Sequence, residues 1–360
     1  MSKLHELLEF GQSVWLDFIE RNLIESGELK DYVELGVCGV TSNPSIFKTA
    51  IANGTAYDSK INELVTGGHD AEEIFEALAL EDIANAADIL RPIYDETDGR
   101  DGFVSLEVDP RLANDSVTTI TEARRLFSVL ARPNIMIKVP ATRAGYTAIE
   151  QLISEGINTN ATLIFSIEQY TKVAQAYIFG IDRLIERGGN PSKVASVASF
   201  FVSRLDGKMD PLLEKAGALE LQGRIAVSYS KTVYAKYKNL FSSAKWQELS
   251  TSGARPQRLL WASTGTKNPK FSDVLYVENL IGSGTVNTIP PKTLVAVLDH
   301  LEVGEHVNEG LDEAGQILEK LPGLGVNIEQ VNNELLAEGV DKFTLAFTEL
   351  IESIGNKAKE

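Results

Sequence analysis

Cysteine is almost absent from this sequence. Cys38 is the only one in 360 residues, which excludes an internal disulfide and is typical of proteins from a reducing compartment. Its neighbours Val37, Gly39 and Val40 are small or apolar. A packed thiol is therefore favoured over a catalytic nucleophile at this position.

Histidine is also scarce, and several familiar motifs are missing. The sequence has no G-x-S-x-G nucleophile elbow, no G-x-x-x-x-G-K-[ST] phosphate loop, and no G-x-G-x-x-G loop after the first predicted strand. Clustered imidazole ligands for a metal are not indicated either, because no predicted strand end carries any of the four histidines His5, His69, His300 and His306. We therefore expect a protein that uses neither a metal nor an organic cofactor.

Excess positive charge and long apolar runs are lacking as well. The 34 basic residues face 51 acidic ones, for a net charge of −17, which argues against a partner such as nucleic acid or an anionic membrane. No apolar run reaches the roughly 18 residues of a membrane span. The N-terminal segment M-S-K-L-H-E-L-L-E-F carries acids where a secretory signal needs an apolar core. These observations favour a cytoplasmic protein.

Short apolar runs alternate with helical patterns along most of the chain. Eight runs are predicted as strands because they are short, apolar and bounded by turn residues: residues 13–17, 36–44, 103–110, 134–141, 157–165, 193–204, 258–265 and 274–282. No obvious helix separates the last two. The order and number of these strands favour an α/β protein with a (β/α)8 TIM barrel, and an open doubly wound sheet is the alternative.

Helical spacing of apolar residues fills most of the stretches between these strands. A short helix is expected over residues 3–11, and another over Ile19 to Leu29. A helical insertion is expected around residues 45–100, and further helices around 291–356. With these additional helices, residues 1–360 are predicted to form one barrel domain.

The segment N-I-M-I-K-V-P-A, from Asn134 to Ala141, carries the most informative single residue. Side chains alternate on a strand, so Met136 and Lys138 share one face. A dry setting disfavours the ammonium form of a lysine, and the neutral amine is the form that attacks a carbonyl to make a Schiff base. The alternative for Lys138 is a structural lysine that reaches the sheet rim or pairs with a carboxylate.

Polar residues recur at the carboxyl ends of the predicted strands. In a barrel these ends face one shared site, and the alternation of side chains selects the inward candidates Asp17, Asn43, Glu107, Lys138, Asn160, Thr162, Ser199, Ser263 and Asn279. Lower inward positions are apolar, as a filled interior requires. An amine with two carboxylates, Asp17 and Glu107, suits Schiff-base aldol chemistry, in which acids move the protons.

Two glycine-containing loops are candidates for binding a phosphate group. Barrels often hold phosphate in the loops after strands seven and eight. Those loops are predicted at Ser263 to Lys267 and at Gly282 to Thr285, where backbone amides and a lysine could face an anion. Arg204 could add a forked clamp. For either loop alone, an ordinary turn is the alternative.

These residues resemble the transaldolase family. The resemblance rests on six segments in order, W-L-D-F at Trp15, T-S-N-P at Thr41, S-L-E-V-D-P-R at Ser105, I-K-V-P-A-T at Ile137, G-I-N-T-N-A-T-L-I-F-S at Gly156 and S-F-F-V-S-R at Ser199. It implies a cofactor-free (β/α)8 enzyme of the pentose phosphate pathway. Such an enzyme moves a dihydroxyacetone unit from sedoheptulose 7-phosphate or fructose 6-phosphate to glyceraldehyde 3-phosphate or erythrose 4-phosphate.

The resemblance also implies a role for each matching residue. Lys138 would form the Schiff base, Asp17 would be the acid and base, and Glu107 with Thr162 would hold the catalytic water. The substrate would contact Asn43, Asn160, Ser199, Phe201 and Arg204. Shorter relatives have S-P-F-V-G-R at the sixth segment and an arginine in the strand-seven loop, so Ser263 and Lys267 would take over that phosphate contact here.

Two other functions remain open from the sequence. A fructose 6-phosphate aldolase would use the same lysine and release dihydroxyacetone. A non-catalytic barrel that binds sugar phosphates is the alternative from another class, although it would not need Asp17, Glu107 and Lys138 together. The expected partners are sugar phosphates, and the chain is expected to be a monomer or a homodimer.

Overall fold

The centre of the molecule is a closed barrel of eight parallel strands, in a computed structural model that describes residues 2–358. Each strand pairs with the next along the chain, and the first pairs with the last. This confirms the predicted (β/α)8 barrel. All strand residues are buried, and the strands are β1 (Gln12–Leu16), β2 (Val37–Thr41), β3 (Phe103–Glu107), β4 (Ile135–Pro140), β5 (Thr159–Ile164), β6 (Ser196–Phe201), β7 (Arg258–Ala262) and β8 (Thr285–Ile289).

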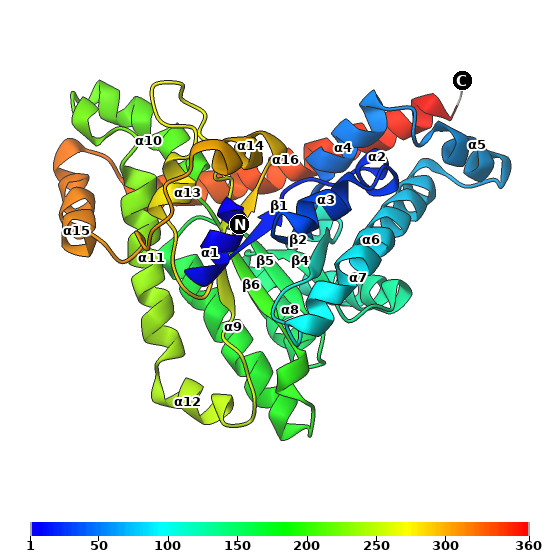
Figure 1. The fold of residues 1–360 in the computed structure, drawn as a ribbon, viewed down its shortest axis with the longest axis horizontal. Coiled ribbons are helices and arrows are strands. Elements are labelled where there is room, and N and C mark those ends of the chain that lie inside the picture. Colours follow the sequence, from blue (N-terminus) through cyan, green and yellow to red (C-terminus); the bar gives the residue numbers. More distant parts are fainter. Residues whose placement is uncertain (1, 359–360) are drawn as a thin grey trace.

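Helices surround the barrel and connect its strands (Figure 1). Three of them lie between β2 and β3, and three follow β8. The helices are α1 (Lys3–Glu9), α2 (Arg21–Glu25), α3 (Glu28–Glu34), α4 (Pro44–Asn53), α5 (Asp58–Thr66), α6 (Ala71–Glu96), α7 (Ser116–Leu130), α8 (Arg143–Ile153), α9 (Ile167–Glu186), α10 (Ser203–Lys215), α11 (Ile225–Phe241), α12 (Ala244–Ser250), α13 (Leu275–Asn279), α14 (Pro291–His300), α15 (Leu311–Lys320) and α16 (Ile328–Lys357).

The eighth strand was predicted in the wrong place. Residues 274–282 contain the helix α13, and β8 begins at Thr285. The strand was missed because Thr285 and Asn287 are polar, although both are fully buried. They are hydrogen-bonded: Gln12 Nε2 donates to Thr285 Oγ1 at 3.0 Å, and Thr264 Oγ1 donates to Asn287 Oδ1 at 2.8 Å. Pairing of this kind lets a buried strand carry polar side chains that hide its apolar pattern.

One predicted phosphate loop, Gly282 to Thr285, lies at the other end of the barrel, because it was placed by the wrongly predicted eighth strand. Residues 282–284 precede β8, and there the backbone N–H of Gly284 donates to the carbonyl of Gly11 before β1. They therefore lie at the amino ends of the strands, opposite the shared site. The single helix predicted over 19–29 is likewise wrong, because α2 and α3 are separated at Gly27, which has a φ of +90°.

Large side chains fill the lower part of the barrel interior. Trp15 is fully buried, and its ring centroid lies 6.2 Å from that of Phe103. Gly39 on the adjacent strand allows this packing, because a Cβ atom there would lie 2.6 Å from the indole of Trp15. At the amino ends of the strands, Arg258 pairs with Asp101 at 2.9 Å. The interior is thus a packed core, and only the carboxyl ends remain for chemistry.

The long helix α16 runs beside α4, although some 280 residues separate the two along the chain (Figure 1). Ion pairs tie α16 to other helices on both sides. Lys48 of α4 pairs with Glu349 at 2.6 Å, Lys357 pairs with Asp58 at 2.7 Å, and Lys208 of α10 pairs with Glu338. These ties hold α16 close to the carboxyl ends of the strands, which its contacts with β5 also reach.

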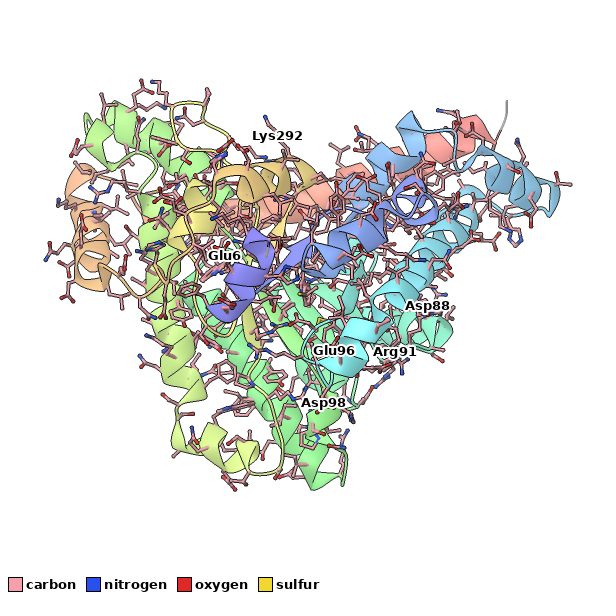
Figure 2. All side chains as sticks on the ribbon, viewed as in Figure 1. Glu6, Asp88, Arg91, Glu96, Asp98 and Lys292 are labelled. Carbon is pink, nitrogen blue, oxygen red and sulfur yellow. The ribbon has the colours of Figure 1, made fainter. Side chains whose placement is uncertain are left out.

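Charged side chains cover the outside of the molecule. Figure 2 shows labelled examples that point away from the ribbon, including Glu6, Asp88 and Lys292. Burial raises the pKa of the one cysteine thiol, Cys38, to about 12, as a packed thiol requires. Among residues 2–358, no helix combines the length and the apolar character that a membrane crossing demands.

Candidate active site

Lys138 lies near the end of β4 and is 4% exposed. Its Nζ atom donates a hydrogen bond to the carbonyl oxygen of Ser42 at 3.0 Å and lies 3.7 Å from Oε2 of Glu107. Glu107 is its register partner on β3, and Asn160 is its partner on β5. Residues in register on parallel strands face the same side, so the alternation of side chains is what places the acid beside the amine.

Glu107 has a buried carboxyl group whose pKa is raised. Loss of solvent raises its pKa from 4.5 to about 7, and the charge of Lys138 only partly offsets this effect. Neither carboxylate oxygen has a hydrogen-bond partner within residues 2–358, and the same holds for the buried hydroxyl of Thr162. Polar atoms that are buried in this way normally have a partner such as ordered water.

Asp17 follows β1 and faces the same cavity as Lys138. Its Oδ1 atom accepts a hydrogen bond from the Thr41 hydroxyl at 2.8 Å, and that hydroxyl lies 2.6 Å from the hydroxyl of Thr288. The carboxyl keeps some contact with solvent through the cavity, yet it lies deep enough that burial raises its pKa. The positive charge of Lys138 opposes this rise.

Arg204 is the strongest candidate for an anion-binding group. Its guanidinium carbon lies 4.9 Å from the ring centroid of Phe201 and 5.6 Å from that of Phe343. Burial lowers the pKa of the guanidinium, and the charges of Asp17 and Glu107 oppose that change. An arginine remains charged under these conditions, so it carries a positive charge at this position.

The loop after β7 lines the same cavity as Arg204 and contacts Ser203, the residue before it. Ser263 has a φ of +56°, and its hydroxyl lies 2.9 Å from the hydroxyl of Ser203. Lys267 lines the same cavity from the end of this loop. The position predicted for this loop was therefore right, in contrast to the loop before β8.

Hydrogen bonds orient both amide-bearing candidates, Asn160 and Asn43. The Ser199 hydroxyl donates to Asn160 Oδ1 at 2.7 Å, and Asn160 Nδ2 donates to the Ser105 hydroxyl at 3.1 Å. Asn43 caps the start of α4, where its Oδ1 accepts from the N–H of Ile46 at 3.1 Å. These bonds fix the orientation of each side chain before any substrate arrives.

Eight of the predicted residues share one cavity of about 150 Å³. Its lining consists of Asp17, Thr41, Asn43, Lys138, Ser199, Phe201, Arg204, Ala262, Ser263, Gly265, Lys267, Thr288, Pro290 and Phe343. Glu107, Asn160 and Thr162 lie behind this lining, where Glu107 and Asn160 touch it through Lys138 and Ser199. Glu107 and Asn160 are thus connected to the cavity lining, and Thr162 lies two residues after Asn160 on β5.

Asn279 was wrongly assigned to this group. It ends α13, where its Nδ2 donates to the Leu275 carbonyl at 2.9 Å, and it lines a separate surface groove. Sequence reasoning also missed Ser42, Ser105 and Phe343. Ser105 precedes Glu107 by two residues on the same strand face, so the alternation of side chains could have identified it. No signal in the sequence identified Phe343.

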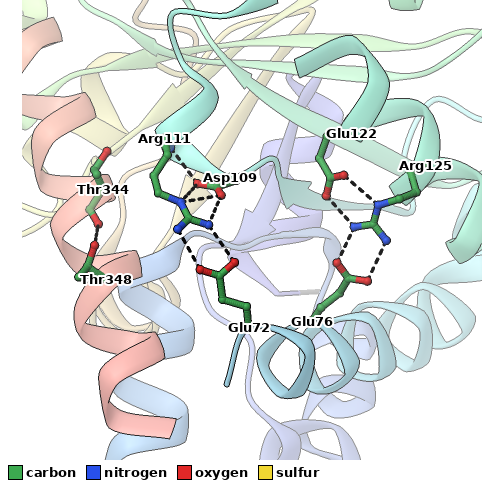
Figure 3. A network of polar contacts seen from close by, with 8 residues as sticks. All are labelled: Glu72, Glu76, Asp109, Arg111, Glu122, Arg125, Thr344 and Thr348. Atoms are coloured by element: carbon green, nitrogen blue, oxygen red, sulfur yellow. Dashed lines mark hydrogen bonds and ion pairs between the residues drawn. The ribbon is translucent and has the colours of Figure 1, made fainter. Parts of the chain in front are cut away.

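A larger cavity of about 610 Å³ lies on the far side of Glu107. Apolar residues such as Phe75 and Phe347 line it. Ion pairs surround it: Arg111 is held between Asp109 and Glu72, and Arg125 between Glu76 and Glu122 (Figure 3). Lys138, Asp17 and Arg204 do not line this cavity. The smaller cavity is therefore the place where the amine, an acid and two cations meet.

Comparisons with known proteins give matches along nearly the whole chain. The family model described as "Transaldolase/Fructose-6-phosphate aldolase" matches residues 14–354. A protein named Transaldolase 2 from Nostoc sp. (strain PCC 7120) is 46% identical over 374 aligned positions, which cover 100% of this chain and 98% of the relative. Proteins named Transaldolase from Trichodesmium erythraeum and Thermobifida fusca are 44% and 45% identical, and each match covers 99% of this chain and 98% of the relative.

Proposed function

Because the chain belongs to the transaldolase/fructose-6-phosphate aldolase family, we propose that it is a transaldolase that works through a Schiff base on Lys138. It moves a dihydroxyacetone unit from a ketose phosphate, such as sedoheptulose 7-phosphate or fructose 6-phosphate, to an aldose phosphate of the pentose phosphate pathway. The observation that supports this proposal most directly is a buried amine 3.7 Å from Glu107, in a cavity shared with Asp17.

The reaction begins at the Lys138 amine. The neutral amine attacks the ketose carbonyl and gives a carbinolamine, which loses water to become an iminium. Asp17 then takes the proton of the hydroxyl on the carbon two positions from the iminium carbon. The bond between this hydroxyl-bearing carbon and the carbon next to the iminium breaks. The electron pair moves to the iminium nitrogen, so an aldose phosphate leaves and a three-carbon enamine stays on Lys138.

The second half runs in the opposite direction with another aldehyde. The enamine carbon attacks the acceptor carbonyl, and Asp17 returns its proton to the new hydroxyl. Water then hydrolyses the iminium and frees the product ketose. Glu107 is suited to activate that water because its carboxylate is buried beside Lys138 and its pKa is near neutrality. We assign Thr162 to the same water, because its buried hydroxyl lacks a partner within residues 2–358.

The remaining polar groups are assigned to substrate recognition. Asn43, Asn160 and Ser199 would bind the hydroxyls of the dihydroxyacetone unit or orient the lysine. Arg204, Ser263 and Lys267 would bind the phosphate group, since they place two cations and a hydroxyl along one side of the cavity. Phe201 shapes the pocket and packs on one face of Arg204.

The experiment that tests the proposed function is a comparison with and without an acceptor. We expect fructose 6-phosphate to be converted rapidly only when erythrose 4-phosphate is present, because the enamine otherwise stays on the enzyme. Sedoheptulose 7-phosphate and glyceraldehyde 3-phosphate are the products to measure. Equal cleavage without an acceptor, with free dihydroxyacetone released, would instead identify a fructose 6-phosphate aldolase, the other activity in the name of the family.

The raised pKa of Glu107 predicts a pH dependence of the turnover rate. Because burial raises its pKa to about 7, the carboxylate form that activates water is lost as the pH falls through about 7. We expect the turnover rate to rise across that range and then level off. Glu107→Gln should remove this step and lower kcat on the order of 10²-fold, within the usual range for acid–base groups.

Asp206 offers a matched control for this pH experiment. Its pKa is also raised to about 7 by burial, but it lies in α10 and accepts hydrogen bonds from the N–H of Ala226 and the hydroxyl of Tyr276. Asp206→Asn should therefore keep both the rate and the pH step. A Glu107→Gln enzyme with the wild-type pH step would remove Glu107 from the mechanism.

A further inference from the structure

The Arg204 guanidinium packs over two aromatic rings, those of Phe201 and Phe343. Within residues 2–358 its guanidinium takes part in no hydrogen bond and no ion pair, although the residue is half-buried and the charges of Asp17 and Glu107 act on it. Aromatic rings contact a guanidinium through its flat faces. The N–H donors at its edge are then left for a ligand with several acceptor oxygens.

The second ring comes from the far end of the chain. Phe343 belongs to α16, is 3% exposed, and lines the cavity that contains Lys138 and Asp17. Its ring centroid also lies 5.9 Å from the Nζ atom of Lys138. One side chain of the C-terminal helix therefore lies over both the cation assigned to phosphate and the amine assigned to the Schiff base.

The helix is built to bring this ring close to the strand ends. Gly339 lies one turn before Phe343 on the same face, and a Cβ atom there would approach Leu163 of β5 to 3.0 Å. With a larger residue at 339, the side chain of Leu163 would have to give way by a few tenths of an ångström. The ion pairs of Lys48 with Glu349 and of Lys208 with Glu338 lie on either side of Phe343 and hold α16 in this position.

We propose that Phe343 is a positioning residue that makes the enzyme selective for phosphorylated sugars by holding the Arg204 guanidinium with a second aromatic ring in addition to that of Phe201. This inference rests on the proposed function and deepens it. Contact with two aromatic rings restricts the orientations of a long, flexible side chain. The sugar phosphate therefore meets an arginine that is already aligned, and less ordering is left for binding to bring about.

The test compares two donors that differ only in the phosphate group. Fructose 6-phosphate and fructose are each supplied with erythrose as an acceptor that lacks phosphate, so that either donor yields sedoheptulose as the measured product. Phe343→Leu keeps an apolar side chain and removes the aromatic face, and we expect it to lower kcat/KM for fructose 6-phosphate about tenfold. The value for fructose should change less than twofold. Phe343→Tyr retains the ring and should stay within about threefold of the wild type for both donors.

Phe347 provides a matched control on the same helix. It lies one turn after Phe343, and its ring is 4.8 Å from the guanidinium carbon of Arg111, outside the small cavity. Phe347→Leu should leave the ratio of the two donors unchanged. Equal losses for both donors in Phe343→Leu would indicate a merely structural role and overturn the proposal. No loss for either donor, or the same selective loss in Phe347→Leu, would overturn it too.

A second measurement separates this inference from the proposed function. Binding of inorganic phosphate can be followed by calorimetry without any turnover. We expect Phe343→Leu to weaken it about tenfold and Arg204→Met to weaken it at least as much. If the wild-type enzyme transferred nothing, the phosphate measurements would still decide the role of Phe343. Unchanged phosphate binding in either variant would contradict it.

Discussion

Lys138→Met is expected to abolish transfer, with kcat reduced on the order of 10⁴-fold or more. Methionine keeps the length and apolar character of the side chain but has no nitrogen, so no Schiff base can form at this position. Steady-state rates with fructose 6-phosphate and erythrose 4-phosphate measure the loss. Borohydride reduction in the presence of the ketose phosphate, followed by peptide mass mapping, should attach a three-carbon unit to the wild-type Lys138 peptide and to no peptide of the variant.

Two other lysines make this experiment specific. Lys231 is also buried, and its Nζ atom donates to the Glu309 carbonyl at 2.9 Å in a different part of the molecule. Lys231→Met should keep both turnover and labelling. Lys267 shares the cavity with Lys138 and is the one competing amine there. Labelling of the Lys267 peptide, or retention of activity by Lys138→Met, would sink the assignment of the nucleophile.

Asp17→Asn is expected to stop the reaction after the Schiff base has formed. Asparagine can still accept the hydrogen bond from Thr41, but it cannot take the hydroxyl proton, so we expect kcat to fall by about 10² to 10⁴-fold. Attack by the Lys138 amine does not need this acid. Borohydride should therefore trap the intact six-carbon sugar phosphate on the variant, whereas the wild type yields the three-carbon unit.

The mass of the trapped adduct decides this second prediction. A three-carbon adduct on Asp17→Asn would show that another group removes the proton during cleavage. Absence of any adduct would place Asp17 in Schiff-base formation instead. Asp206→Asn serves as the control for a buried aspartate changed to its amide, because Asp206 lies outside the cavity. That variant should give the wild-type rate and the three-carbon adduct.

Seven of the eight strands could be predicted because their signal is local. Runs such as 134–141 are apolar on both faces and end at proline, as strands buried on both sides do. The eighth strand has the sequence T-V-N-T-I, and the Thr285 hydroxyl and the Asn287 amide oxygen accept hydrogen bonds from Gln12 and Thr264. These partners cannot be identified from the local sequence. The eighth strand was therefore predicted at the apolar segment that forms the helix α13.

The difference between local signals and contacts with distant residues also explains which site residues could be predicted. Lys138, Glu107 and Asn160 follow from the alternation of side chains once the strands are placed, and Asp17 follows from its position just after β1. The prediction for Asn279 was wrong because the strand on which it was placed is the helix α13. Phe343 lies on a helix more than 130 residues from Arg204, and nothing in its local pattern distinguishes it from Phe347.

By itself, the sequence determined the barrel and the inward direction of the lysine and its acids, because the period of a strand is a property of the backbone. Only the tertiary structure decided that α16 crosses to the strand ends and places Phe343 on Arg204 and over Lys138. The position of that helix depends on its packing against α4, on its ion pairs and on the close approach at Gly339. These contacts join distant segments, and no local pattern encodes them.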